Sequence, residues 1–236
     1  PALVTLWIRR SVPEPEIWQA ARRERPAVPS TAALLRTLFA GSLRRHTIIV
    51  ASMQAFSLFG WWGLFTWIPA YLALPASQGG RGLGLVQSST WIILQQCGMW
   101  LGYVTFGFLS DWVGRKRTYI AYLLVAAALV PLYGMAGEPR WLLLLGPLVA
   151  FFGTGYFSGL GAIASELFPT SVRGTALGFV YNLGRATSAV APYAVGSLSE
   201  PYGLGSAFLI TSGAFVLAAL TALGLEETRG KPLPAG

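Results

Sequence analysis

Long hydrophobic runs alternate with short polar segments along most of this sequence. A helix needs roughly 20 mostly apolar residues to cross the hydrocarbon layer of a membrane. Segments that reach this length with few or no ionisable groups lie at about 46–74, 84–110, 141–165, 175–198 and 203–225, and a further one, rich in Ala and Leu, at about 118–137. The pattern predicts an all-α membrane protein with a six-helix transmembrane bundle over 46–225.

The composition agrees with this interpretation. Apolar residues make up 54% of the chain, charged residues 11% and aromatic residues 13%, which is unlike an ordinary soluble domain or a disordered chain. Residues 1–10 resemble the end of a further membrane span. Because no Met opens the chain, we expect it to be a fragment.

Basic residues are distributed unevenly between the two sides of the predicted bundle. Those on one side precede the first full span or lie in every second loop and the tail: Arg9, Arg10, Arg22, Arg23, Arg25, Arg36, Arg44, Arg45, Arg115, Lys116, Arg117, Arg173, Arg229 and Lys231. The opposite loops hold only Arg81 and Arg140. Since Lys and Arg gather in cytoplasmic loops, we expect these loops and the C-terminus to be cytoplasmic, in a plasma (bacterial inner) membrane. The net charge of +8 therefore reflects topology, and no nucleic-acid partner is expected.

The soluble segments follow from the same pattern. Residues 11–45 are rich in Pro and Arg and are interpreted as a central cytoplasmic loop on an anionic lipid surface, with short helices at 17–24 and 31–39. Residues 226–236 form a cytoplasmic tail. Cys97 is the sole cysteine and His46 the sole histidine. The sequence contains no catalytic, phosphate-binding or metal-ligand motif and no carboxylate pair inside a span, so we expect neither an enzyme nor a cofactor or metal site.

Arg185 is the only charged side chain predicted to lie deep inside a span. At about 1.5 Å per residue it is near the middle of the 175–198 helix. A charge there costs about 2.5–3.5 kcal/mol on insertion scales, so it should face the bundle interior or a wet cavity. Its planar fork suits a carboxylate. The predicted partner is therefore a substrate carboxylate or, alternatively, a structural group outside this chain.

Further polar residues are candidates for the same cavity. Tyr181 and Asn182 share a helix face with Arg185, and Pro192 should bend that span by freeing a carbonyl. Gln54 and Trp61 share a face of the 46–74 helix. Gln95 lies mid-span in the next helix. Intramembrane amides also join helices by hydrogen bonds, so packing is the alternative for each.

Three motifs lie at the ends of hydrophobic runs. The first is Gly107-Phe108-Leu109-Ser110-Asp111-Trp112-Val113-Gly114-Arg115-Lys116-Arg117, the second Ser165-Glu166-Leu167-Phe168-Pro169-Thr170-Ser171-Val172-Arg173-Gly174, and the third Glu226-Glu227-Thr228-Arg229-Gly230-Lys231. In this order they resemble the cytoplasmic signatures of the major facilitator superfamily, with Trp112 where that family usually has a basic residue. The resemblance covers essentially the whole chain.

The resemblance implies the C-terminal half of a twelve-helix transporter: the end of helix six (1–10) and helices seven to twelve, arranged as two inverted three-helix repeats. The N-terminal half is then a missing partner. It also implies gating roles, with no part in substrate binding, for Asp111, Gly114, Arg115, Glu166 and Arg173. Glu166 and Arg173 flank one hinge and are expected to form a local pair.

The expected function is secondary active transport of a small organic anion, an aromatic acid or other carboxylate, with a proton. Tyr181-Asn182-Leu183-Gly184-Arg185 and the tryptophan-rich helix seven resemble the metabolite and aromatic-acid proton symporters. A sugar:proton symporter is the alternative, favoured by the Glu-Thr-Arg-Gly-Lys tail and by Val12-Pro13-Glu14-Pro15-Glu16. A transporter-like receptor that moves nothing is the alternative from another class. The proton-coupling carboxylate is expected in the missing half.

Overall fold

The fold is all-α, as the sequence predicts. It is known from a computed structural model that describes residues 2–13, 19 and 30–234. The α-helices are α1 (Ala2–Ser11), α3 (Thr31–Leu38), α4 (Leu43–Phe65), α5 (Ile68–Ala73), α6 (Leu85–Val113), α7 (Arg115–Met135), α8 (Pro139–Gly155), α9 (Phe157–Leu167), α10 (Arg173–Ser188), α11 (Ala191–Tyr202), α12 (Leu204–Ala207) and α13 (Leu209–Ala222), with a short 3₁₀ turn at Ala76–Gln78. The predicted helix at 31–39 is confirmed as α3. The one predicted at 17–24 lies, apart from Gln19, outside the described residues.

Five helical segments of the described chain are long and apolar enough to cross a membrane. They are Leu43–Ala73, Leu85–Val113, Arg115–Met135, Pro139–Leu167 and Leu204–Ala222. These confirm the spans predicted at 46–74, 84–110, 118–137, 141–165 and 203–225. Several of them contain short interruptions, as between α4 and α5 at Thr66–Trp67 and between α8 and α9 at Tyr156.

The span predicted at 175–198 takes a different form. It consists of two shorter helices, α10 and α11, separated at Ala189–Val190, and it is not among the five long apolar segments. Pro192 lies in the first turn of α11. Because proline cannot donate a hydrogen bond to the carbonyl four residues earlier, the continuous helix ends before it. The bend expected at Pro192 is therefore present as a break.

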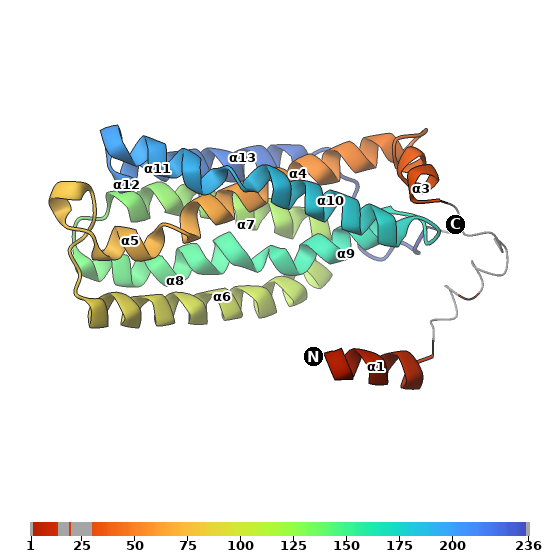
Figure 1. Cartoon of the computed structure of the whole chain (residues 1–236), viewed down its shortest axis with the longest axis horizontal. Coiled ribbons are helices and arrows are strands. Elements are labelled where there is room, and N and C mark those ends of the chain that lie inside the picture. The colour runs from red at the N-terminus through yellow and green to blue at the C-terminus, as the bar shows by residue number, and fades with distance from the viewer. Residues whose placement is uncertain (1, 14–18, 20–29, 235–236) are drawn as a thin grey trace.

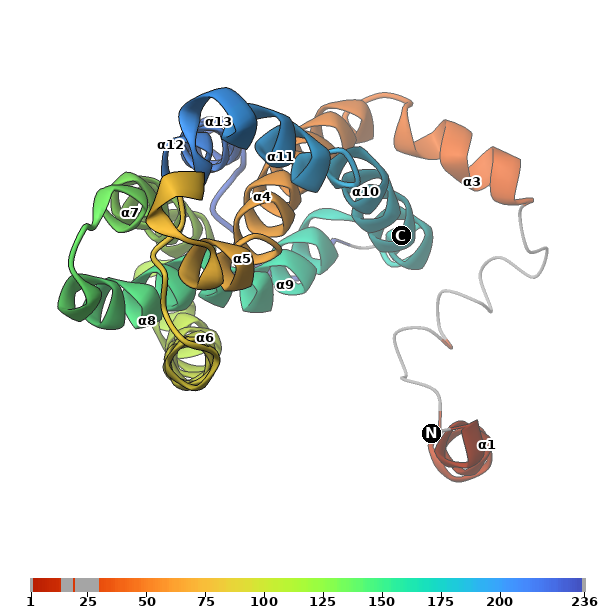
Figure 2. The ribbon, with the colours of Figure 1, turned by 60° about the vertical axis from the view of Figure 1, so that its left-hand side comes forward.

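The long helices lie side by side along one axis (Figure 1). Their contacts run in the order α6, α8, α7, α13, α4 and α10, and α4 also contacts α11 (Figure 2). This order places α4 among three neighbours, whereas α6 packs chiefly on α8. In consequence α4 is largely buried, and α6 keeps a long exposed face with Trp100, Phe108 and Trp112 at 65, 74 and 75% exposure.

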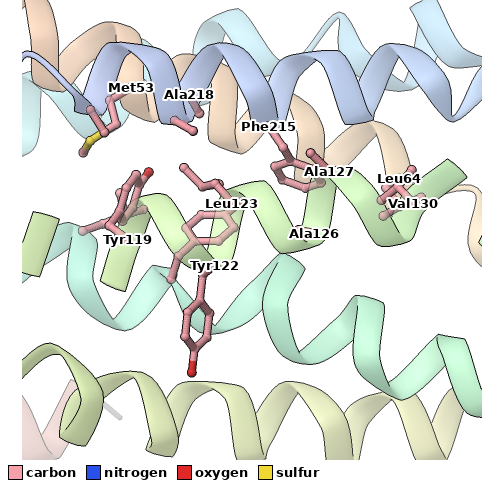
Figure 3. Close-up of a cluster of buried hydrophobic side chains, with 14 of the residues drawn as sticks. Met53, Leu64, Tyr119, Tyr122, Leu123, Ala126, Ala127, Val130, Phe215 and Ala218 are labelled. Carbon is pink, nitrogen blue, oxygen red and sulfur yellow. The ribbon is translucent and has the colours of Figure 1, made fainter. Parts of the chain in front are cut away.

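The core lies between α4, α7 and α13. Figure 3 shows Met53 and Leu64 of α4, Leu123 and Val130 of α7, and Phe215 of α13 meeting there; all of them are buried. Several large core side chains are tyrosines, whose hydroxyls need hydrogen-bond partners in a dry interior.

Ser57 provides the hydrogen-bond partners of two core tyrosine hydroxyls. The Tyr119 hydroxyl lies 3.0 Å from Ser57 Oγ, and the Tyr156 hydroxyl donates to the Ser57 carbonyl oxygen at 2.8 Å. One position on α4 thus joins α7 to the junction of α8 and α9.

Helix α6 approaches α8 so closely that only glycine fits at the contact. A methyl group added at Gly98 would overlap the carbonyl oxygen of Pro147, and one at Gly102 would overlap that of Phe151. Small residues at such spacing let two helix backbones come into contact. In lipid the hydrophobic effect does not drive helices together, so the dispersion energy of this close contact stabilises their association. The α6–α8 contact therefore depends on these two glycines.

We expect Gly102→Ala to lower the melting temperature of the detergent-purified protein by several degrees. The added methyl must push α6 away from α8, and such overpacking costs about 1–3 kcal/mol. Gly107→Ala on the same helix is the control, because a methyl there meets nothing within 4 Å. Equal melting temperatures for the two variants would contradict the backbone contact.

Candidate functional site

Arg185 and Tyr181 lie one turn apart on the exposed side of α10. The Arg185 guanidinium carbon is 5.8 Å from the centre of the Tyr181 ring. The opposite side of α10 packs on α4, where a methyl group at Gly184 would lie 3.2 Å from the Cβ atom of Gln54. Among the described residues, no salt bridge includes Arg185. Its charge is therefore in contact with an aromatic face but is not neutralised by a described carboxylate.

A cavity of about 460 Å³ lies where α4, α9 and α10 meet. Its lining residues are Gln54, Phe157, Leu160, Gly161, Ala164, Leu177, Gly178 and Tyr181; we call it the Gln54 cavity. Gln54 is 3% exposed, and its Oε1 atom has no hydrogen-bond partner. A buried carbonyl oxygen without a donor is costly, so this amide can accept a hydrogen bond from a ligand in the cavity.

A second cavity of about 290 Å³ contains Arg185. Its lining residues are Trp62, Arg185, Ser188, Ala189 and Pro192; we call it the Arg185 cavity. It adjoins the break between α10 and α11. The two cavities follow one another along α10, since Tyr181 lines the first and Arg185, four residues later, lines the second. Together they present an aromatic wall, a cation and an amide oxygen.

Two other predicted site residues lie close to these cavities without lining them. The Asn182 side chain is exposed and donates to the Gly178 carbonyl oxygen at 2.8 Å. The Trp61 indole N–H donates to Thr154 Oγ1 at 3.2 Å, and its ring meets the edge of Phe157, with the ring centres 5.7 Å apart. Trp61 therefore packs against Phe157, which lines the Gln54 cavity.

Gln95 lies elsewhere. It is 3% exposed and its Nε2 atom donates to the Tyr133 hydroxyl at 3.1 Å. Tyr133 belongs to a network in which the Tyr71 hydroxyl donates toward the Gly134 carbonyl oxygen at 2.9 Å and Arg81 donates to the same oxygen at 2.8 Å. The structure thus gives Gln95 the role of joining α6 to α7, and it does not bring it together with Arg185.

Sequence reasoning missed Phe157, which lines the Gln54 cavity. Aromatic residues are frequent in these spans, so no sequence signal separates this ring from those that face lipid.

A cluster of charges surrounds the start of α7. Arg115 pairs with Asp111 one turn earlier, and its Nε atom donates to Glu166 Oε1 at 3.2 Å. Thr228 Oγ1 donates to the other oxygen of Glu166. The cluster therefore joins the end of α6, the end of α9 and the segment after α13, which are the three motifs singled out in the sequence.

Glu227 completes this cluster and was not singled out from the sequence. Its Oε1 atom accepts from the backbone N–H of Arg115 at 2.8 Å and from that of Thr228 at 3.1 Å. Its carboxylate lies against Gly114, whose φ of 122° and missing side chain leave the room. A carboxylate at a helix N-terminus caps unpaired N–H groups and interacts favourably with the helix dipole. Glu227 thus acts as the cap of α7.

The expected pair between Glu166 and Arg173 is wrong. Glu166 is bound by Arg115 and Thr228, whereas Arg173 Nε donates to the Phe168 carbonyl oxygen at 3.1 Å. The Arg115 guanidinium, which also pairs with Asp111, binds Glu166. Arg173 instead binds the backbone of the loop that precedes it.

Within the described ranges, no three His, Cys, Asp or Glu side chains come close enough together to hold a metal ion.

Comparison with known proteins gives a consistent result. Residues 50–236 match the sequence model of the Major Facilitator Superfamily. A probable 4-methylmuconolactone transporter of Cupriavidus pinatubonensis is 32% identical, over 98% of this chain and 52% of the relative. A cis,cis-muconate transport protein of Acinetobacter baylyi is 30% identical, over 98% of this chain and 56% of the relative. The chain spans about half the length of the curated relatives it matches.

The fold is also similar to a solved structure. The crystal structure of a peptide transporter POT, an E310Q mutant in complex with alafosfalin, superposes with a TM-score of 0.71 at 16% identity. The match covers 88% of this chain and 45% of that one. At this identity the likeness concerns the fold alone.

We expect Glu227→Gln to destabilise the start of α7 by about 1–2 kcal/mol, because the cap loses its charge while keeping its shape. Faster amide hydrogen exchange at residues 115–118 is the measurement. Glu226→Gln is the matched control, since Glu226 is exposed and forms a 3.3 Å surface ion pair with Lys231. Equal exchange in both variants would show that Glu227 does not cap the helix.

Proposed function

The chain belongs to the Major Facilitator Superfamily, and we propose that it is the C-terminal half of a transporter that carries a small organic anion across a membrane. The proposed substrate is an aromatic acid or another carboxylate, moved together with a proton by alternating access. In this proposal residues 1–10 end helix six, 11–45 form the central loop, 46–225 form the bundle and 226–236 the tail. The basic loops and the C-terminus are on the cytoplasmic side of the bacterial inner membrane, by the positive-inside rule.

The observation that carries the proposal is Arg185 in its cavity. A guanidinium inside a hydrophobic bundle is retained at a cost of several kcal/mol only with a compensating partner. The described residues provide the ring of Tyr181 and no carboxylate. A substrate carboxylate supplies the missing charge through two parallel hydrogen bonds.

The relatives support the same class of ligand. Both reported relatives are named as transporters, and the one from Acinetobacter baylyi is named for muconate, which is a carboxylate. These names favour transport over catalysis. They also favour an organic acid over a neutral substrate.

The remaining cavity residues give the site its selectivity in this proposal. The Tyr181 and Phe157 rings provide flat apolar surfaces for an unsaturated or aromatic body. The free Oε1 of Gln54 accepts from a hydroxyl or a protonated group. Two further residues lie next to the proposed site: Asn182 is exposed near Arg185, and Trp61 packs against Phe157. Gln95 is left out, because its amide is used between α6 and α7.

A sugar substrate is the second candidate. It is favoured by the unpaired Gln54 oxygen, because sugar recognition depends on amide and aromatic side chains. It does not explain a cation in the adjoining cavity, which has no role toward a neutral ligand.

The cluster around α7 is proposed to control the conformational cycle. Alternating access needs contacts that form in one state and break in another. Asp111, Gly114, Arg115 and Glu166 lie at the boundary between α6, α9 and the tail, away from the Arg185 cavity. Arg173 is the first residue of α10, shortly after this cluster's Glu166 in sequence. The proton-coupling carboxylate is assigned to the N-terminal half.

Arg185→Lys tests the anion site, because lysine keeps the charge and loses the planar fork. In the full-length protein we expect an aromatic acid to raise the melting temperature, and the variant to bind it about tenfold more weakly. Arg140→Lys is the control, since Arg140 is exposed and paired with Glu138. Unchanged binding in Arg185→Lys would refute the bidentate contact. Stabilisation by a hexose that survives Arg185→Ala would favour the sugar candidate.

Asp111→Asn tests the gating role. Loss of one carboxylate from the pair with Arg115 should change the turnover rate by several-fold while leaving the apparent substrate affinity nearly constant. Uptake kinetics with Glu226→Gln as the control distinguish this outcome from a general loss of charge. A large loss of affinity at normal turnover would contradict the assignment.

A further inference from the structure

An apolar groove of about 550 Å³ runs between α4 and α13. Its lining residues are Phe56, Phe59, Ile210, Gly213, Ala214, Val216 and Leu217; we call it the α4–α13 groove. Phe56 and Gln54 are two residues apart on α4 and therefore point to nearly opposite sides of the helix. The groove is thus separate from the Gln54 and Arg185 cavities, and it contains no polar side chain that would bind a carboxylate substrate.

The groove continues as an apolar surface toward one end of the two helices. On α4, Ile48 is 47% exposed and precedes Phe59 by eleven residues, about three full turns, so the two share a face. On α13, Leu220 is 54% exposed and follows Gly213 by seven residues, about two turns, so they also share a face. The surface ends at Arg45, about 16 Å from Phe56 along the helix. One leaflet of a bilayer has a similar depth, half of about 30 Å.

Arg45 and Arg44 carry charge that the described residues leave uncompensated. Arg45 reaches the segment just after α13, where its Nη2 atom lies 3.5 Å from the Gly224 carbonyl oxygen. This is longer than a well-formed hydrogen bond, and a guanidinium has five donors. Neither arginine belongs to any salt bridge in the described part of the chain, and both are exposed. Two arginine side chains therefore lie at the end of an apolar surface whose length is close to the depth of one leaflet.

We propose that this surface is a binding site for one anionic phospholipid of the cytoplasmic leaflet. The phosphate and headgroup contact Arg44 and Arg45, and one acyl chain runs past Ile48 and Leu220 into the α4–α13 groove. An acyl chain matches a groove lined only by hydrocarbon, and each arginine near an anionic surface strengthens the attraction. The inference rests on the proposed orientation, with Arg44 and Arg45 at the cytoplasmic side, and is independent of the substrate.

Lipid retention by the full-length protein tests the site. The protein is purified in detergent and examined by native mass spectrometry with palmitoyl-oleoyl phosphatidylglycerol, and separately with the phosphatidylcholine of the same chains. We expect one phosphatidylglycerol to remain bound at a concentration where phosphatidylcholine is lost. The double variant Arg44→Gln, Arg45→Gln should lower this retention about tenfold or more, because it removes both cations.

A second variant tests the groove itself. A Cβ atom at Gly213 meets nothing within 4 Å, and Gly213 lines the groove, so the ring of Gly213→Phe should occupy the groove and abolish selective retention. Arg140→Gln, for charge, and Leu124→Phe, on the exposed face of α7, are the controls and should retain the lipid. Equal retention of the two phospholipids, or full retention in Gly213→Phe, would overturn the proposal.

The same samples separate this inference from the proposed function. Stabilisation by an aromatic acid is measured on each lipid-site variant, and we expect it to persist, since neither groove nor arginines line the cavities. If Arg185→Ala loses acid binding but retains the lipid, the substrate site is affected and the lipid site is not. Absence of lipid selectivity in the unsubstituted protein, with acid binding intact, refutes the lipid site alone.

Discussion

Hydrocarbon offers no hydrogen bonds, so every polar group inside the bundle must find its partner within the protein or within a cavity. This constraint explains why the described chain consists of helices. It also explains the use of Ser57, whose hydroxyl and carbonyl serve Tyr119 and Tyr156 in the core. Thr187 likewise donates back to the Leu183 carbonyl oxygen. Packing in this fold therefore also provides hydrogen-bond partners for the polar groups of the core.

Two of the exceptions to this rule lie where substrate binding is proposed. The Gln54 carbonyl oxygen has no donor, and Arg185 faces a ring instead of a carboxylate. Arg185 lies on α10 shortly before its break with α11, and Gln54 lies on α4 where that helix packs against Gly184 of α10. An interrupted helix is tolerated at membrane depth where it lines a cavity. Unsatisfied groups and an interrupted helix thus occur together, as a ligand site requires.

The cluster at α7 shows how distant motifs depend on one another. Glu227 caps α7, Arg115 of the same turn holds Glu166, and Thr228 binds that carboxylate from the tail. Lys116 adds contacts to the Leu223 and Leu225 carbonyl oxygens at 2.7 and 2.8 Å. The end of the chain is therefore fastened to the start of α7, and a movement of either segment must break several charged hydrogen bonds together.

Hydrophobic run lengths determined five of the membrane spans, because a lipid-crossing helix is specified locally by about twenty apolar residues. The motif residues likewise identified the family, and Arg185 was recognised from its depth alone. Pro192 likewise indicated the interruption between α10 and α11, because the cause is local. The pairing of Glu166 with Arg115 instead of Arg173, the capping by Glu227 and the use of Gln95 between α6 and α7 were decided by tertiary structure. Each depends on which side chains from distant segments meet, and a local pattern of hydropathy contains no information about such contacts.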